Sequence, residues 1–339
     1  MSEEFNLIDH YFLPLSQSLA DDEVGIGDDG AVLTPPENHQ LVVVTDTLVA
    51  GVHFPHDTSA YDIAWKALAV NLSDLAAMGA RPGFFSLGLT LPENNHDWLK
   101  DFSEGLAELS RIYQIPLIGG DTTKGPLTVT VTAHGWVGKG RALLRSGATP
   151  GDLICVSGCL GDAGLGLKAA LKTFSETQQA WFTKGMLDSS LTALNRPCPQ
   201  LELGQLLKDY ASAAIDVSDG LLADMGHILE RSSAKKGSPV GAEIFLDQLP
   251  MSEAVQEWIA KTDDWSLPLS AGDDYQLCFT ISQRKWLELS EKCASEGLNV
   301  QSIGRVTEYP GVKIKASSSD EMQAEQAERL LSAQGYQHF

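Results

Sequence analysis

The sequence has no long apolar run. Its longest apolar stretches, LVVV and FFSLGLTL, fall far short of the roughly 18 residues that a membrane-spanning helix needs. The opening segment, MSEEFNLIDHYFLPLSQ, has no basic region followed by an apolar one, so we expect no export signal. The sequence therefore predicts a cytoplasmic protein with no membrane partner.

The sequence also lacks closely spaced pairs of cysteines. The 339 residues include five cysteines, at positions 155, 159, 198, 278 and 293, and none of them form C-x-x-C. This pattern argues against a disulfide framework or a zinc site and is typical of reduced cytoplasmic thiols. The composition, 43% hydrophobic and 20% charged, is that of a globular protein, and the length predicts two domains.

Positive charge is scarce. The chain has 24 Lys and Arg against 45 Asp and Glu, which gives a formal net charge of −21. Nucleic-acid backbones are held by Lys and Arg, so we expect no nucleic-acid partner. A protein this acidic that handles phosphate would need bound divalent cations to supply positive charge. The simpler explanation, an acidic surface that maintains solubility, accounts for most of the carboxylates.

Common nucleotide-binding motifs are also absent. The chain has no Walker A loop and neither H-R-D nor D-F-G. GIGDDG, residues 25–30, fits G-x-G-x-x-G, but no strand is expected before it and Pro35 and Pro36 prevent a long helix after it. Asp28 and Asp29 would also repel a pyrophosphate. We therefore do not expect this loop to bind a dinucleotide.

Strands and helices alternate along the chain, which predicts an α/β protein of the α+β type. In the first half we expect strands at 39–48, 82–92, 116–121 and 125–138, and helices at 59–80 and 94–115. In the second half we expect strands within 152–158, 212–217, 273–282 and 299–308, and helices within 159–174, 195–207 and 218–232. The turn-rich segment 140–152 separates a predicted N-terminal domain, residues 1–140, from a C-terminal α/β domain, residues 150–339.

Aspartates recur at expected strand ends and in glycine-rich turns. They are Asp28 and Asp29 in GIGDDGAVL, Asp46 between Thr45 and Thr47, Asp74 one helical turn after Asn71, Asp121 in LIGGDTT, and Asp216 and Asp219 in AIDVSDGL. Carboxylate and hydroxyl oxygens select Mg²⁺ or Ca²⁺ over zinc. Magnesium ions that bridge carboxylates and phosphates are a common solution in phosphoryl transfer. The recurrence therefore predicts metal-dependent phosphate chemistry.

Each of these positions also has a local explanation. Asp46 could simply end a strand, Ser218 or Asp219 could be the N-cap of the following helix, and Asp74 could be an ordinary helix carboxylate. GCLGDAGLGL, residues 158–167, is interpreted as a turn that opens a helix and could face a phosphate. The recurrence in five separate segments favours function for the set as a whole.

Seven segments occur in the order found in thiamine-monophosphate kinases, a family of the AIR synthetase-like superfamily of ATP-dependent enzymes. They are GIGDDGAVL, TDTLVAGVHF, KALAVNLSDLAAMGARP, LIGGDTT, RSGATPGD, AIDVSDGL and SAGDDYQLCF. The chain resembles this family from about Asn6 to the C-terminal GYQHF. The resemblance implies a two-domain AIR synthetase-like fold. Its N-terminal mixed sheet would form a barrel in a homodimer, and its C-terminal domain would complete the active-site cleft.

The resemblance implies transfer of the γ-phosphoryl group of ATP to thiamine monophosphate, with several Mg²⁺ ions, to give thiamine diphosphate. The metal ligands it implies are Asp28, Thr45, Asp46, Thr47, Asp74, Asp121, Asp216 and Asp219, with Asp29 left open. The nucleotide or phosphate contacts are Gly120, Asp121, Arg145 and Ser218. The substrate contacts are His53, Asp273 and, by alignment of the tail alone, Tyr336. Asp46, Asp121 and Asp219 are expected to matter most for catalysis.

Ala271 and Asp273 depart from the family pattern, in which SGGED would be typical. The carboxylate is kept but is one methylene shorter, which would loosen a contact to the cationic ring system of the substrate. A phosphate acceptor oxygen is already deprotonated near neutral pH, so direct in-line transfer needs no strong base and no covalent intermediate. Arg145 can add a bidentate phosphate contact.

Three alternatives remain open. The chain could be another AIR synthetase-like ATP-dependent enzyme. It could also be a non-catalytic nucleotide or divalent-cation sensor on the same scaffold, although a sensor would have no need of His53 and Asp273. His53 itself could be a turn residue with a purely structural hydrogen bond.

Overall fold

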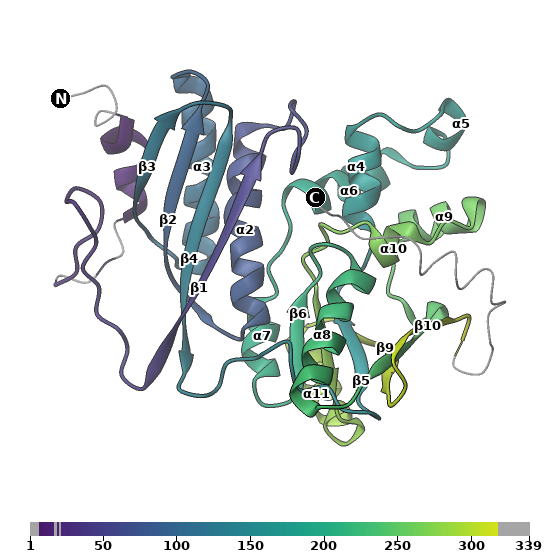
Figure 1. Cartoon of the computed structure of the whole chain (residues 1–339). Helices are drawn as coiled ribbons and strands as arrows, with labels where there is room; N and C mark the ends of the chain where they lie inside the picture. Colours follow the sequence, from purple (N-terminus) through teal and green to yellow (C-terminus); the bar gives the residue numbers. More distant parts are fainter. Residues whose placement is uncertain (1–6, 17–18, 20–21, 318–339) are drawn as a thin grey trace. The chain divides into compact units, whose positions relative to one another are not determined.

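The computed structural model describes residues 7–16, 19 and 22–317 and divides into two compact units (Figure 1). Unit 1 comprises Met1–Leu75 and Ala80–Ala142, and unit 2 comprises Ala76–Gly79 and Leu143–Phe339. Within the described ranges, none of the helices is long and apolar enough to span a membrane.

Unit 1 contains a four-stranded mixed sheet. Its strands are β1 (His39–Val49), β2 (Arg81–Leu91), β3 (Leu117–Lys124) and β4 (Thr128–Gly138), in the order β1-β4-β2-β3. The β2–β3 pair is parallel, and β4 is antiparallel to both β1 and β2. The predicted strands and both predicted helices of this half are confirmed, the helices as α2 (Ala60–Ala77) and α3 (His96–Tyr113). Before the sheet come the short helices η1 (Ile8–Phe12) and η2 (Leu13–Ser16).

Burial alternates along the strands of this sheet. Val129, Val131 and Ala133 of β4 are fully buried, whereas the threonines between them are partly exposed. In Figure 1 the helices α2 and α3 lie behind the sheet, and the apolar residues Leu99 and Phe102 of α3 are fully buried. The side chain of Asn95 accepts a hydrogen bond from the Trp98 amide, which fixes the start of α3. The helices therefore cover one face of the sheet and leave the other face open.

Unit 2 is built on a six-stranded mixed sheet in the order β10-β7-β9-β5-β8-β6. The strands are β5 (Leu153–Ser157), β6 (Ala213–Asp216), β7 (Gly241–Phe245), β8 (Leu277–Ile281), β9 (Val300–Thr307) and β10 (Gly311–Lys315). The helices are α4 (Asp162–Ala170), α5 (Glu176–Gln179), α6 (Lys184–Asn195), α7 (Leu201–Leu207), α8 (Leu221–Lys236), α9 (Glu253–Thr262), α10 (Ser266–Ser270) and α11 (Gln283–Glu296), with the 3₁₀ turn η3 (Leu246–Gln248). The two mixed sheets confirm the two-unit α/β fold, while β7 and β10 were not predicted.

Glu243 links three strands of the unit 2 sheet. Its carboxylate accepts from Nη2 and Nε of Arg305 on β9, at 2.6 and 2.7 Å, and lies 3.2 Å from Nζ of Lys315 on β10. Burial raises the pKa of this carboxyl, but the hydrogen bonds and charges of Arg305 and Lys315 outweigh burial and lower the pKa below its ordinary value of 4.5. The ionised form is therefore the one that stabilises the sheet.

Glu243→Gln is expected to lower the free energy of unfolding by about 1–2 kcal/mol near neutral pH, because a charged acceptor is lost. The pKa is lower in the folded state, so this stabilisation is present above pH 4.5 and disappears as the pH falls through the lowered pKa. Denaturant unfolding of both proteins at neutral and at acidic pH measures the difference. An equal difference at both pH values would contradict the ion-pair explanation.

Candidate active site

Asp46 lies inside β1, in agreement with the strand expected at 39–48, and does not end the strand. The strand continues to Val49. Thr45 and Thr47 lie on one face of the sheet and Asp46 on the other, which is the alternation expected of a strand. Asp46 is opposite the buried Val131 and therefore faces the helix side. Burial raises the pKa of its carboxyl. A desolvated carboxylate of this kind is unfavourable by itself and suits a site that receives a cation.

Thr45 and Thr47 point to the opposite, open face. Their hydroxyls hydrogen-bond to those of Thr132 and Thr130 on β4, at 3.0 and 2.9 Å. An ion held by the Asp46 carboxylate cannot also take these two hydroxyls. A role of the two threonines as metal ligands therefore stays a prediction and would have to use their main-chain oxygens.

Gly120 and Asp121 lie within β3, which continues past them to Lys124. A Cβ atom at Gly120 would lie 1.9 Å from the carbonyl oxygen of Leu87 on the neighbouring strand. Asp121 is exposed, and it is aligned with Gly88, Thr130 and Thr47 in one row across the sheet. Gly120 thus has a structural reason to be glycine that is independent of any nucleotide.

The sheet of unit 1 keeps Asp46 and Asp121 apart. Asp46 lies on the edge strand β1 and Asp121 on the opposite edge strand β3. Three interstrand spacings separate these strands, about 14 Å. The row that contains Asp46 passes through the buried Val131 and Leu87, whereas Asp121 shares the open face with Thr130. The two carboxylates therefore point to different faces at different edges.

His53 is held in a tight turn directly after β1. Its Nδ1 accepts from the Val49 amide at 2.9 Å, and its own amide donates to the Val49 carbonyl at 3.0 Å. Nζ of Lys66 on α2 donates to the His53 carbonyl at 3.3 Å. Because Nδ1 accepts, the neutral ring carries its proton on Nε2. In this tautomer the hydrogen-bond donor of the imidazole is Nε2–H.

The middle of α2 carries polar residues on a largely buried helix. Lys66 is 2% exposed, and the sequence analysis did not select it. Asn71 is fully buried, its Nδ2 donates to the Ala67 carbonyl, and its Oδ1 has no hydrogen-bond partner among the described residues. Asp74, one turn later, is half-buried. The sequence signal that could have drawn attention to Lys66 was a lysine inside an otherwise apolar helical segment, because lysine is rarely buried.

Asp28 and Asp29 lie in an exposed loop. Val24 and Val32 pair with each other through two 2.9 Å backbone hydrogen bonds, and the loop extends between them. The Asp28 carboxylate accepts from the Asp29 amide at 3.0 Å. Both side chains are exposed, so both carboxylates are accessible to an ion.

In unit 2, Asp216 ends β6 and a turn at residues 217–220 leads into α8. Neither Ser218 nor Asp219 is the N-cap of α8. Gly220 occupies that position, with no side-chain cap. The amides of the turn are instead bound by Asp224, a buried residue of the first turn of α8. The sequence analysis missed Asp224.

Asp273 lies in a second loop that is hydrogen-bonded to this turn. Its amide donates to the Ser218 carbonyl at 2.8 Å, and the Tyr275 hydroxyl donates to its carboxylate at 3.2 Å. Asp273 has φ +60, in the left-handed region that Asp tolerates better than most residues. Ala271 has an ordinary φ of −72 and contacts the helix α4, because a Cβ at Gly164 would lie 2.5 Å from the Ala271 methyl. The structure therefore brings Ser218, Asp219 and Asp273 together.

Arg145 is exposed in the segment that precedes β5. The neighbouring carbonyl of Leu144 accepts from the Ala214 amide of β6, and the amides of Gly147 and Ala148 donate to Oγ of Ser232. These contacts fix the segment beside the strand that carries Asp216. Tyr336 lies outside the described residues.

The turn GCLGDAG, for which a phosphate contact is predicted, has one amide that already binds a carboxylate. Asp274 is buried, and both its carboxylate oxygens lie within 3.0 Å of the Gly161 amide. The N-cap of α4 therefore already has a carboxylate partner.

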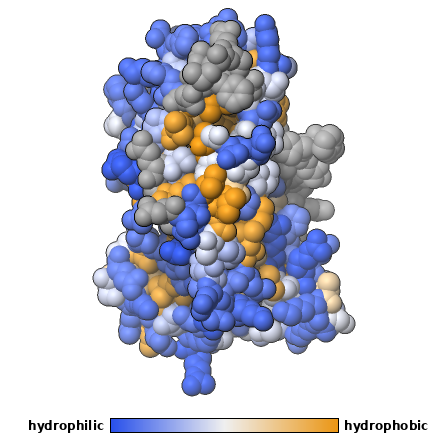
Figure 2. All heavy atoms as spheres, turned by 90° about the vertical axis from the view of Figure 1, so that its left-hand side faces the viewer, coloured by the Kyte–Doolittle hydropathy of each residue, from blue (hydrophilic) through white to orange (hydrophobic). Residues whose placement is uncertain are grey.

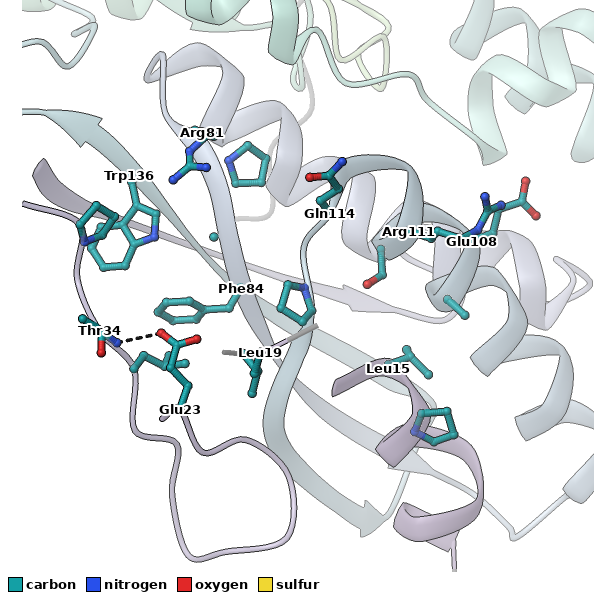
Figure 3. Close-up of a pocket in the computed structure, with 18 of the residues that line it drawn as sticks. Leu15, Leu19, Glu23, Thr34, Arg81, Phe84, Glu108, Arg111, Gln114 and Trp136 are labelled. Atoms are coloured by element: carbon teal, nitrogen blue, oxygen red, sulfur yellow. Dashed lines mark hydrogen bonds between the residues drawn. The ribbon is translucent and has the colours of Figure 1, made fainter. Parts of the chain in front are cut away.

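A cavity of about 970 Å³ in unit 1 contains none of the predicted site residues (Figure 3). It lies at the start of β2 and the end of α3, with Arg81, Phe84, Arg111 and Trp136 in its lining. Figure 2 shows the side of the molecule on the left in Figure 1, where apolar patches alternate with hydrophilic side chains. The predicted sites instead follow strand edges and loops.

The candidate ligands suit a hard cation in chemistry, because all of them offer oxygen. Burial, and after it the charges of the nearby Asp216 and Asp219, raises the pKa of the Asp224 carboxyl, and the second cause indicates a local excess of negative charge. Across the described residues, no group of three or more His, Cys, Asp or Glu side chains is arranged to hold a metal ion. The donor chemistry fits Mg²⁺, although the described residues of the chain do not bring such a group of side chains together.

Comparison with known proteins identifies the family. The model of the AIR synthase related protein N-terminal domain matches residues 27–137, and that of the C-terminal domain matches residues 149–317. The thiamine-monophosphate kinase of Salmonella typhimurium is 45% identical over 304 residues, which cover 90% of each chain.

Two solved structures agree with this result. The thiamine-monophosphate kinase of Stenotrophomonas maltophilia is 45% identical, with a TM-score of 0.83 and coverage of 94% of this chain and 98% of that one. The structure described as AaThiL complexed with AMPPCP and TMP is 28% identical, with a TM-score of 0.73 and coverage of 99% and 97%. The chain therefore belongs to the AIR synthase related proteins and, among them, to the thiamine-monophosphate kinase family.

Proposed function

We propose that this protein transfers the γ-phosphoryl group of ATP directly and in line to thiamine monophosphate in the cytoplasm. Identity of 45% over 90% of the Salmonella typhimurium thiamine-monophosphate kinase carries the assignment. The relative complexed with AMPPCP and TMP supports ATP as the donor and thiamine monophosphate as the acceptor. The presence of His53 and Asp273 supports an enzyme over a sensor.

Magnesium is the cofactor that this residue set would hold. In unit 1 the ligands would be Asp28, Asp46, Asp74 and Asp121, with main-chain oxygens of Thr45 and Thr47, and in unit 2 they would be Asp216 and Asp219. When bound, Mg²⁺ offsets the repulsion between the phosphates of the two substrates. The carboxylates supply the charge that retains the ions, which accounts for phosphate chemistry in a protein of net charge −21.

The other residues bind and orient the substrates. Gly120 and Ser218 would contact the nucleotide, and Arg145, exposed on its fixed segment, would hold a phosphate by two hydrogen bonds. His53 would donate from Nε2 to the substrate, because its Nδ1 is engaged by the Val49 amide. Asp273 would face the cationic ring system, oriented by the Tyr275 hydroxyl. No residue needs to act as a strong base, because the acceptor oxygen is deprotonated near neutral pH.

The test is incubation of the purified protein with ATP, Mg²⁺ and thiamine monophosphate, followed by chromatography for thiamine diphosphate. Product formation that stops when Mg²⁺ is chelated is expected. Intact nucleotide binding with no product would contradict the kinase assignment and leave the sensor.

We further propose that the homodimer uses unit 1 and that each active site takes residues from both protomers. The open face of the sheet exposes Leu41 and Val43, at 48% and 54%. Asp46 and Asp121 occupy opposite edges about 14 Å apart in one protomer, three interstrand spacings. If β1 of one protomer lies next to β3 of its partner, as barrel closure requires, the two edges meet and each site takes residues from both protomers, with the Asp46 and Asp121 carboxylates on opposite faces of the joined sheet.

This arrangement predicts complementation between two inactive variants. Asp46→Asn and Asp121→Asn homodimers are each expected to be inactive. Mixed dimers would contain one site with both replacements and one with neither. Since random mixing gives about half mixed dimers, each with one intact site of two, about a quarter of wild-type activity is expected. No recovery in mixtures shown to exchange subunits would place each site within a single protomer.

A further inference from the structure

Asp224 binds an entire turn with one carboxylate oxygen. Its Oδ2 accepts from the amides of Ser218, Asp219 and Gly220 at 3.0, 3.0 and 3.1 Å. Asp224 is 2% exposed and lies in the first turn of α8. The turn it binds joins β6 to α8 and carries Ser218 and Asp219, for which nucleotide and metal contacts are proposed.

The other side of the same turn is bound by the loop that carries Asp273. Val217 exchanges backbone hydrogen bonds with Tyr275 and Gln276, at 2.8 and 2.7 Å, and the Asp273 amide donates to the Ser218 carbonyl. A Cβ at Gly272 would lie 2.5 Å from that carbonyl oxygen, so the two backbones are in close contact. A displacement of the turn would therefore displace the Asp273 loop with it.

We propose that Asp224 is a positioning residue that supports both substrates: it fixes the turn with Ser218 and Asp219, and through that turn the loop with Asp273. This inference rests on the proposed roles of Asp219 and Asp273. It adds a residue that would touch neither substrate and would act through main-chain amides. Charged acceptors form stronger hydrogen bonds with amides than neutral ones, which suits an anchor of three donors.

The position is an unfavourable one for a carboxylate. Burial, followed by the charges of Asp216 and Asp219, raises the pKa of Asp224 to about 7. A residue that merely filled space here could be apolar without this cost. The three amide contacts are the feature that an apolar residue could not supply.

Asp224→Ala is expected to raise the KM for ATP and the KM for thiamine monophosphate about tenfold or more each, because both contact sets shift. Tyr275→Phe removes only the hydroxyl that binds the Asp273 carboxylate, so it should raise the KM for thiamine monophosphate and leave that for ATP unchanged. Glu243→Gln is the matched control. Glu243 lies on β7, and its carboxylate, like that of Asp224, accepts from several donors. Because β7 is far from β6 in the sheet order, this replacement should change neither KM.

Asp224→Asn separates positioning from simple stabilisation. Its side-chain carbonyl can still accept from the three amides, so both KM values are expected to return close to those of the wild type even if the melting temperature stays lowered. Damage equal to that of Asp224→Ala, or a folded Asp224→Ala with both KM values unchanged, would overturn the proposal. If Asp224→Ala does not fold, the KM values of Asp224→Asn decide alone.

A failure of the proposed metal-binding role of Asp219 would give a different experimental result. Asp219→Asn with full activity at every Mg²⁺ concentration would remove Asp219 from the proposed metal site. The effect of Asp224→Ala on the KM for thiamine monophosphate would still be measurable. The two conclusions are therefore tested by separate variants.

Discussion

Asp46→Asn is expected to lower kcat by about a thousandfold while the protein stays folded. The carboxylate lies in the interior of β1, faces the helix side and is desolvated, which raises its pKa. A carboxylate in such a place has a strong electrostatic interaction with a bound cation, and the amide lacks the charge. The loss should therefore appear in turnover and in the Mg²⁺ concentration that half-maximal activity requires.

The stability of Asp46→Asn is expected to move in the opposite direction to its activity. A neutral amide costs less to desolvate than a carboxylate, so without metal the free energy of unfolding should be unchanged or higher. Asp97→Asn is the matched control, because it makes the same chemical change at an exposed position of α3 and should keep full turnover. A folded Asp46→Asn protein with normal kcat would remove Asp46 from the catalytic machinery.

Gly120→Ala is expected to destabilise unit 1 by about 3 kcal/mol or more. The added Cβ would lie 1.9 Å from the carbonyl oxygen of Leu87 and 2.8 Å from its carbonyl carbon, and both are main-chain atoms of β2. A backbone cannot rotate away as a side chain can, so β2 and β3 would have to separate along their parallel pairing.

Gly119→Ala provides the comparison within the same strand. No atom lies within 4 Å of a Cβ built at Gly119, so this change should alter stability by less than about 0.5 kcal/mol. Denaturant unfolding of both variants at one protein concentration separates the two, since the open face is the proposed dimer interface. Equal stabilities would show that the close approach of β2 and β3 is not required.

The sequence was most informative where the local pattern and the tertiary environment agree. The strands β1, β2 and β4 are long, rich in Val, Thr or Phe and bounded by turns, and they were predicted. β7 and β10 were not, because GAEIF and GVKIK are short and include Glu243, Lys313 and Lys315. Their stability as strands depends on the pairing of β10 with β7 and of β7 with β9, and on the ion pairs that Glu243 makes with both neighbouring strands, which no local pattern shows.

The candidate site was predicted in part for the same reason. The motifs identified the turn with Asp219 and the loop with Asp273, but not the hydrogen bonds that join them. Asp224 reads as an ordinary acidic residue in the first turn of a helix, a common position for carboxylates. Its contact with three amides depends on how the chain from β6 bends into α8, which only the folded structure reveals.

The sheet of unit 2 also sets an order for biosynthesis. β5 lies between β8 and β9, so neither of its partners exists when Ser157 leaves the ribosome, and the first arrives only with Leu277. At typical rates of translation this interval is on the order of ten seconds. During it, a strand whose residues 154–157 are all buried in the final fold has no neighbour. All four strands of the unit 1 sheet have been synthesised by Gly138. The nascent chain can therefore complete this sheet while β5, a central strand of the unit 2 sheet, still lacks both neighbouring strands.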